Sequence, residues 1–260
     1  MESFHTALRW SHIIGGSVGL IVYWIAALTK KGGDIHKRAG RCFVYIVYYV
    51  AGTAMFSTLW GNLFPNSFVH SEGLSQERID GIRFFTSILM LLASLTLSAA
   101  YLGVQSLRTR KTPERLGSPL LYGFFVLQIA TALWLAWIGY VDMSRYGGQR
   151  FWICFGLSAL GLVDAMQQVI HIRKKASQHM AWFLKHLECM AGCGAAFHTA
   201  AAVTVTRVID LQLPGSWQLL PWVLPSAVAI IFGAALKKKY QKRFRLGETN
   251  PEQAHQTSVT

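Results

Sequence analysis

Three ionisable side chains interrupt two of the most apolar stretches of the sequence, and they are its best candidates for chemistry. Asp164 lies in residues 151–171, and His186 and Glu188 lie in residues 180–205. An ionisable group is costly inside a membrane, so it usually faces the interior of a helix bundle and has a function there. Asp164 and Glu188 are therefore candidate catalytic residues, either as two carboxyl groups that share a proton or with Asp164 orienting a histidine ring.

The spacing of the polar residues predicts that these side chains face one another. One helix face carries four polar residues with i, i+3, i+4, i+7 spacing: Asp164, Gln167, Gln168 and His171. The next helix carries a line of residues seven apart: His179, His186 and Cys193. If the two helices are antiparallel neighbours, Asp164, His186 and Glu188 lie at matching depth, about 9–12 Å from one helix end.

Histidine is the residue type that most favours a metal or haem here. His36, His179 and His186 are candidate metal ligands at one level of the membrane. His12 and His198 are candidate cofactor ligands at a second level, since His198 follows His186 by about 18 Å along a helix. The expected cofactor is haem b or a divalent metal. The alternative for each histidine is a hydrogen bond that packs one helix against another.

The elements that must position these residues are seven apolar segments, each long enough to cross a bilayer. They are expected at about 11–29, 42–64, 83–105, 119–141, 151–171, 180–205 and 218–236. No alternating strand pattern competes with them, and backbone groups in lipid must be satisfied within helices. The sequence therefore predicts an all-α bundle of seven transmembrane helices, a single domain over residues 1–246, with a polar, disordered tail over 247–260.

The distribution of charge predicts the orientation of the bundle. Only 14% of the residues are charged, yet the formal net charge is +13. Basic residues gather in alternate loops and in the C-terminal segment, which predicts an outside N-terminus and a cytoplasmic C-terminus in a bacterial inner membrane. A basic run beside a helix end contacts anionic lipid, so membrane lipid, and not nucleic acid, is the expected partner.

The four cysteines are too few for a disulfide framework, and Cys189 and Cys193 are expected to act as small buried hydrophobes.

Three elements of the chain resemble bacterial multi-pass membrane proteins of unknown function. They are a lysine-glycine-glycine turn leading to a histidine (Lys31 to Gly40), the segment His179–His186 with its His-x-x-Trp pattern, and an LP…WVLP ending (Leu213 to Pro225). This resemblance implies a polytopic fold and no established activity. The two histidine levels and the basic element at His36 are also similar to transmembrane cytochromes b, which implies haem.

Four functions remain open from the sequence. The first is a haem- or metal-binding redox protein, suggested by the histidines. The second is a proton-coupled carrier in which Asp164 and Glu188 titrate. The third is a metal-dependent membrane hydrolase, which requires three ligands at one level. The fourth is an accessory membrane subunit without catalytic activity.

Overall fold

A computed structural model describes residues 2–147, 150–175, 178–209, 217 and 220–243, and within these ranges the chain is helical and contains no strand. Seven helices are long: α1 (Glu2–Leu28), α2 (Asp34–Leu63), α4 (Gln76–Arg108), α5 (Pro119–Tyr146), α6 (Arg150–Ile170), α7 (Ala181–Val208) and α8 (Leu220–Arg243). Three are short: α3 (Pro65–Phe68), the 3-10 turn η1 (Pro113–Arg115) and the π-helical turn η2 (His171–Lys175).

The seven long helices are each apolar and long enough to cross a membrane, which confirms the predicted segments and indicates a multi-pass membrane protein. Several helices extend beyond the predicted ends. α1 begins at Glu2 instead of residue 11, and α2 begins at Asp34 instead of residue 42. Hydropathy marks only the apolar middle of such a helix, while the hydrogen-bonded backbone continues into polar residues. The predicted tail over 247–260 lies outside the described residues.

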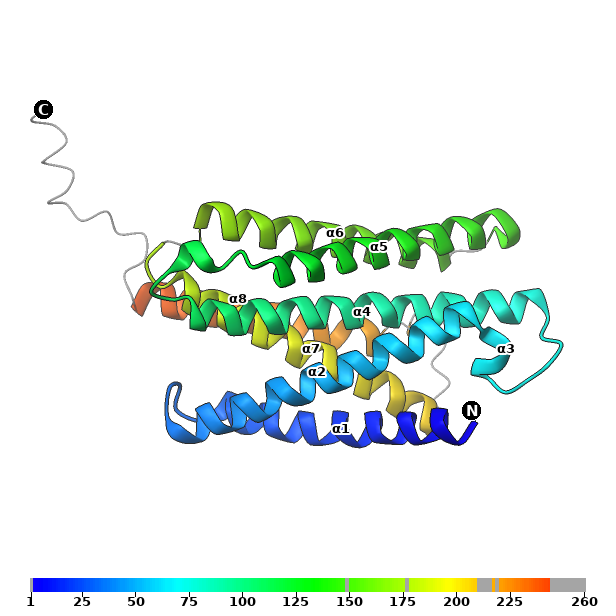
Figure 1. Cartoon of the computed structure of the whole chain (residues 1–260), viewed down its shortest axis with the longest axis horizontal. Coiled ribbons are helices and arrows are strands. Elements are labelled where there is room, and N and C mark those ends of the chain that lie inside the picture. Colours follow the sequence, from blue (N-terminus) through cyan, green and yellow to red (C-terminus); the bar gives the residue numbers. More distant parts are fainter. Residues whose placement is uncertain (1, 148–149, 176–177, 210–216, 218–219, 244–260) are drawn as a thin grey trace, which may run out of the picture.

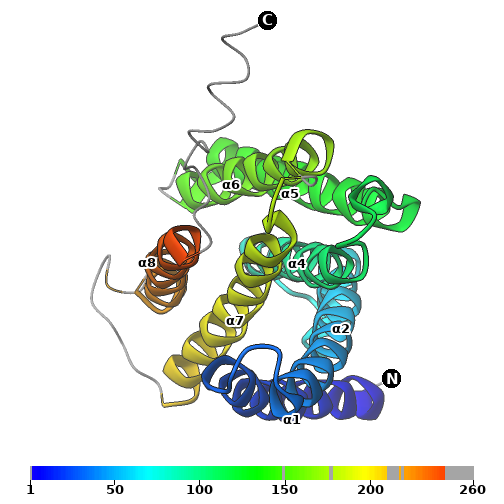
Figure 2. The same cartoon turned by 90° about the vertical axis from the view of Figure 1, so that its left-hand side faces the viewer.

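Helix α4 lies at the centre of the bundle and packs against α2, α5 and α7 (Figures 1 and 2). α1, α2, α4 and α7 form a four-helix unit, which Figure 2 shows end-on. α5 and α6 pair on the other side of α4, and α8 packs against α7. The expected packing of α6 against α7 was wrong, because α6 packs mainly against α5 and α7 mainly against α4 and α8.

The lysine-glycine-glycine turn closes one end of the bundle, which we call the basic end and which also includes residues 109–115 and the last turns of α8. Lys31 Nζ donates to the carbonyl of Ala26 at 3.1 Å and also to that of Ala27, and His36 Nδ1 donates to the carbonyl of Ala26 at 2.9 Å. These bonds satisfy carbonyls that the last turn of α1 leaves free. Gly32 adopts φ +80°, a left-handed conformation that suits glycine.

Replacing Gly32 by alanine should therefore destabilise this turn by about 1–2 kcal/mol, because a Cβ strains the left-handed backbone. Gly40→Ala is the matched control, since Gly40 lies in a helix and a Cβ there meets no atom within 4 Å. Thermal unfolding of the two variants in detergent measures the difference. Equal melting temperatures for the two would contradict a strained turn at Gly32.

Glycines opposite cysteines allow the central helices to approach closely. A Cβ at Gly103 of α4 would lie 2.8 Å from the Cβ of Cys189 on α7, and a Cβ at Gly139 of α5 would lie 2.6 Å from that of Cys154 on α6. Cys154, Cys189 and Cys193 are all buried. This confirms that Cys189 and Cys193 act as small packing residues.

Candidate functional site

Asp164 is the centre of a polar cluster that connects α4, α5 and α6. Gln128 Nε2 of α5 donates to Asp164 Oδ2 at 3.0 Å and to the carbonyl of Gly161 at 2.8 Å. Gln128 is completely buried, and its Oε1 accepts a 2.6 Å hydrogen bond from Ser98 Oγ of α4. Gln168 Nε2, one turn after Asp164, also donates to Oδ2. The carboxyl group is thus held in one orientation by two amides.

The two oxygens of Asp164 differ in their surroundings. Both amide donors bind Oδ2, and in the described part of the chain no hydrogen bond ends on Oδ1. The Oε1 atom of Gln168 is buried and has no partner among the described residues, although the side chain lies against Asp164. Among the described residues, Asp164 Oδ1 thus accepts no hydrogen bond, and Gln168 Oε1 is a buried acceptor without a donor, which is unusual for a buried group.

Asp80, near the opposite end of the bundle, shows what a structural carboxylate looks like in this protein. Gln76 Nε2 donates to its Oδ1 at 2.9 Å, and Arg145 Nη1 and Tyr146 Oη donate to its Oδ2 at 2.6 and 2.9 Å. Both oxygens are occupied and the charge is neutralised by an arginine. Among the described residues, Asp164 has no arginine partner, and its Oδ1 accepts no hydrogen bond.

A buried lysine accompanies Asp164 at the N-terminal end of α7. Lys185 Nζ forms a 2.9 Å ion pair with Glu188 Oε1, and the Lys185 side chain is only 9% exposed, whereas that of Glu188 is 51% exposed. Lys237 of α8 lies 3.9 Å from the other oxygen of Glu188. Asp164 interacts electrostatically with Lys185 and Glu188. Charged groups thus lead from the buried Lys185 to the exposed side of α7 and α8.

The sequence analysis found Asp164 and Glu188 but missed Gln128 and Lys185 as members of this cluster. Gln128 is an amide in the middle of a long apolar segment, and a search for buried amides as well as ionisable groups finds it. Lys185 lies near a helix start, where a lysine usually extends toward water. Its burial is a property of the folded bundle, which a local pattern does not reveal.

His186 lies at the expected depth but on a different side of α7. His186 Nδ1 donates to the carbonyl of Gly103 on α4 at 3.0 Å. Neighbouring residues of a helix point about 100° apart, so His186 faces the four-helix unit while Lys185 interacts with Glu188 and Asp164. The predicted His/carboxylate site is therefore two groups: Asp164 with Lys185 and Glu188, and His186 with the residues of α4.

The three candidate metal ligands are not gathered as a three-ligand site. His179 is exposed in the turn before α7, whereas His36 and His186 are partly buried. In residues 2–147, 150–175, 178–209, 217 and 220–243, no three His, Cys, Asp or Glu side chains lie close enough to hold a metal ion together. This geometry offers no support for a catalytic zinc centre, which takes three protein ligands.

His12 and His198 make hydrogen bonds to different helices. His12 Nδ1 lies 3.0 Å from Thr53 Oγ1 of α2. Trp24 Nε1 of α1 donates to His198 Nε2 at 3.0 Å, and His198 Nδ1 donates to the carbonyl of Gly194 at 2.7 Å. Both ring nitrogens of His198 are thus engaged within the protein, which is the geometry of a packing histidine.

Comparison of the chain with known protein families, curated proteins and solved structures finds no match.

Proposed function

We propose that this multi-pass membrane protein carries protons across its membrane by binding and releasing them at Asp164. In this proposal the basic end faces the cytoplasm of a bacterial cell and the N-terminus lies outside, as the distribution of lysine and arginine favours. Intramembrane carboxyl groups are the residues that proton pathways use, because burial makes their charged and neutral forms comparable in free energy.

The observation that carries the proposal is the open oxygen of Asp164. The amides of Gln128 and Gln168 hold Oδ2, so Oδ1 is left to accept a proton. The lone acceptor Gln168 Oε1 gains a donor if its amide turns when Asp164 is protonated, since a carboxylic acid can donate a hydrogen bond. Protonation of Asp164 would thus supply the donor that Gln168 Oε1 lacks while the carboxyl group is ionised.

The ion pair beside Asp164 supplies the connection to the basic end. Lys185 interacts electrostatically with both Asp164 and Glu188. When Asp164 is protonated and loses its charge, Lys185 should interact more strongly with Glu188. Glu188 and Lys237 are half exposed, so this end of the ion pair lies at the side of the bundle. Proton binding and release at Asp164 are thus coupled electrostatically to charged side chains that reach the surface.

The test is proton flux into proteoliposomes that contain a pH-sensitive dye, driven by a potassium diffusion potential. The wild-type protein is expected to carry protons faster than protein-free vesicles do. Asp164→Asn should reduce the flux to the protein-free level, because an amide keeps the shape of the carboxyl group but does not titrate. Asp34→Asn is the control, since the Asp34 side chain is 91% exposed and lies outside the cluster.

Two results would contradict the proposal. Wild-type flux equal to that of protein-free vesicles would favour an accessory subunit without transport, and undiminished flux in the folded Asp164→Asn protein would exclude Asp164 as the proton carrier. The fold of each variant is checked by gel filtration and circular dichroism before reconstitution.

A further inference from the structure

His36 and His186 occupy equivalent positions on two helices that line the four-helix unit. His36 is followed on α2 by Phe43 and Val47, seven and eleven residues later. His186 is followed on α7 by Cys193 and Phe197 at the same two spacings. Seven residues make almost two full helical turns, so each histidine lies on the same face as the two residues that follow it.

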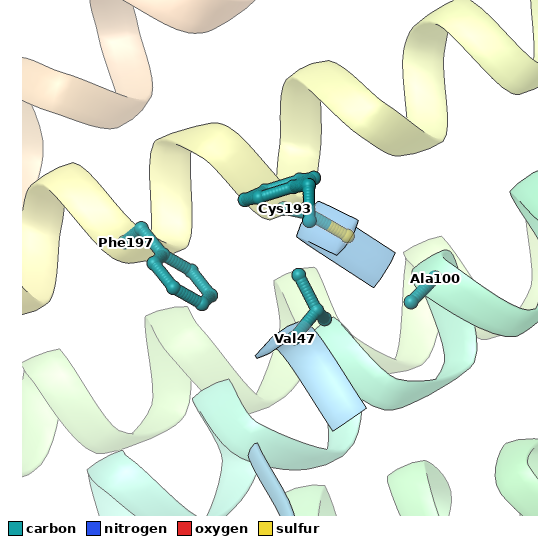
Figure 3. Packing of buried hydrophobic residues seen from close by; sticks show 5 residues of the cluster. Val47, Ala100, Cys193 and Phe197 are labelled. Carbon is teal, nitrogen blue, oxygen red and sulfur yellow. The ribbon is translucent and has the colours of Figure 1, made fainter. Parts of the chain in front are cut away.

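Those following residues meet in the centre of the unit. Phe43, Val47, Cys193 and Phe197 form one buried cluster with Ala100 of α4, and Val47 and Cys193 have no exposed surface (Figure 3). α2 and α7 therefore turn these faces toward each other across the unit. His36 and His186 lie on the same two faces, about 10 Å closer to the basic end.

Main-chain carbonyls fix the protonation of both rings. His36 Nδ1 lies 2.9 Å from the carbonyl oxygen of Ala26 on α1, and His186 Nδ1 lies 3.0 Å from that of Gly103 on α4. A carbonyl only accepts, so Nδ1 carries the hydrogen in each neutral ring and Nε2 keeps its lone pair. In the described residues no hydrogen bond ends on either Nε2 atom. This is how metal-binding histidines are usually oriented.

The two rings are close enough to influence each other. His186 interacts electrostatically with His36 and with Lys31. Gly40 follows His36 by one helical turn on the same face, and a Cβ there would meet no atom within 4 Å.

We infer that His36 and His186 form a two-imidazole site at the basic end of the four-helix unit, which binds a metal centre that needs only two protein ligands. The two candidates of this chemistry are a haem iron, whose other four ligands come from its own porphyrin, and copper(I), which two imidazoles can satisfy. The described residues supply no third ligand, so a tetrahedral zinc site does not fit. This inference is independent of proton transfer at Asp164.

The test is titration of the purified protein in detergent with haemin in one arm and copper(I) in the other. One equivalent of one of them should bind. If haem binds, its absorption and electron paramagnetic resonance spectra should be those of low-spin iron with two imidazole ligands; if copper(I) binds, X-ray absorption should show two nitrogen ligands. The inference would be overturned if neither haemin nor copper(I) bound saturably, or if the bound centre had fewer than two imidazole ligands. Neither result requires a variant.

His36→Asn and His186→Asn then identify the ligands. The amide nitrogen of asparagine occupies the position of Nδ1, so the bond to the carbonyl is kept while Nε2 is removed. Each substitution should weaken binding by at least about 100-fold. That is the largest loss typical of removing a residue that only hydrogen-bonds to a metal ligand, and a ligand itself should matter at least as much. His198→Asn should have no effect, because both nitrogens of His198 already have partners. Unchanged binding in the double variant, or loss in His198→Asn, would also overturn the assignment.

Discussion

Gly194→Ala is expected to destabilise the protein by about 3 kcal/mol, the upper range for forcing extra atoms into a packed core. A Cβ at Gly194 of α7 would overlap the ring of Tyr23 on α1. Tyr23 has little freedom to move, because its ring contacts those of Phe43 and His198, with centroids 5.3 and 5.6 Å away. The substitution should therefore separate α1 from α7.

Gly192→Ala, two residues earlier on the same helix, is the matched control. A Cβ there meets no atom within 4 Å, and alanine is a better helix former than glycine by about 1 kcal/mol. The two substitutions should consequently shift the melting temperature in detergent in opposite directions. A similar shift for both would mean that α1 and α7 do not pack through Gly194.

Gln128→Leu is expected to lower both stability and proton flux. Leucine is similar in size, but it removes three hydrogen bonds of a completely buried side chain, to Ser98, Gly161 and Asp164. Hydrogen bonds between helices in a membrane are worth about 0.6–1.7 kcal/mol each, so the loss of three should cost about 2–5 kcal/mol. The flux should fall because Asp164 loses the donor that orients it.

Gln167→Leu separates this effect from a general loss of polarity. Gln167 also lies on α6 near Asp164 but is exposed, so its replacement should change stability by less than about 0.5 kcal/mol. Thermal unfolding and the proteoliposome assay measure both variants. Normal flux and stability in Gln128→Leu would show that Gln128 does not hold Asp164.

The depth of the candidate residues was predictable, but their rotation about the helix axes was not. Asp164 interacts electrostatically with Glu188, as expected if both lie at a similar height, because a helix rises by a constant amount per residue. The pattern of seven also placed His186 in line with Cys193. Whether that line faces α6 or α4 depends on the packing of α7, which turned out to be against α4 and α8.

The sequence pattern also did not show which distant segments supply the hydrogen-bond partners of the candidate residues. Gln128 reaches Asp164 from 36 residues away, and Gly103 accepts from His186 over 83 residues. The need for glycine at Gly103, Gly139 and Gly194 is equally hard to see within one segment. It arises from the side chains that a neighbouring helix places against each of these positions. Spacing within a helix carries no information about such pairs.

By itself, the sequence determined that this chain forms seven apolar helices with acids and histidines among them, because helix length and hydropathy are local properties of consecutive residues. Only the tertiary structure decided that Asp164 joins Gln128, Lys185 and Glu188 while His186 turns toward the four-helix unit. The physical reason is that a membrane helix is apolar on its lipid-facing and its buried sides alike. Its composition therefore sets where it runs, whereas packing of small and polar residues from other helices sets which way each side chain faces.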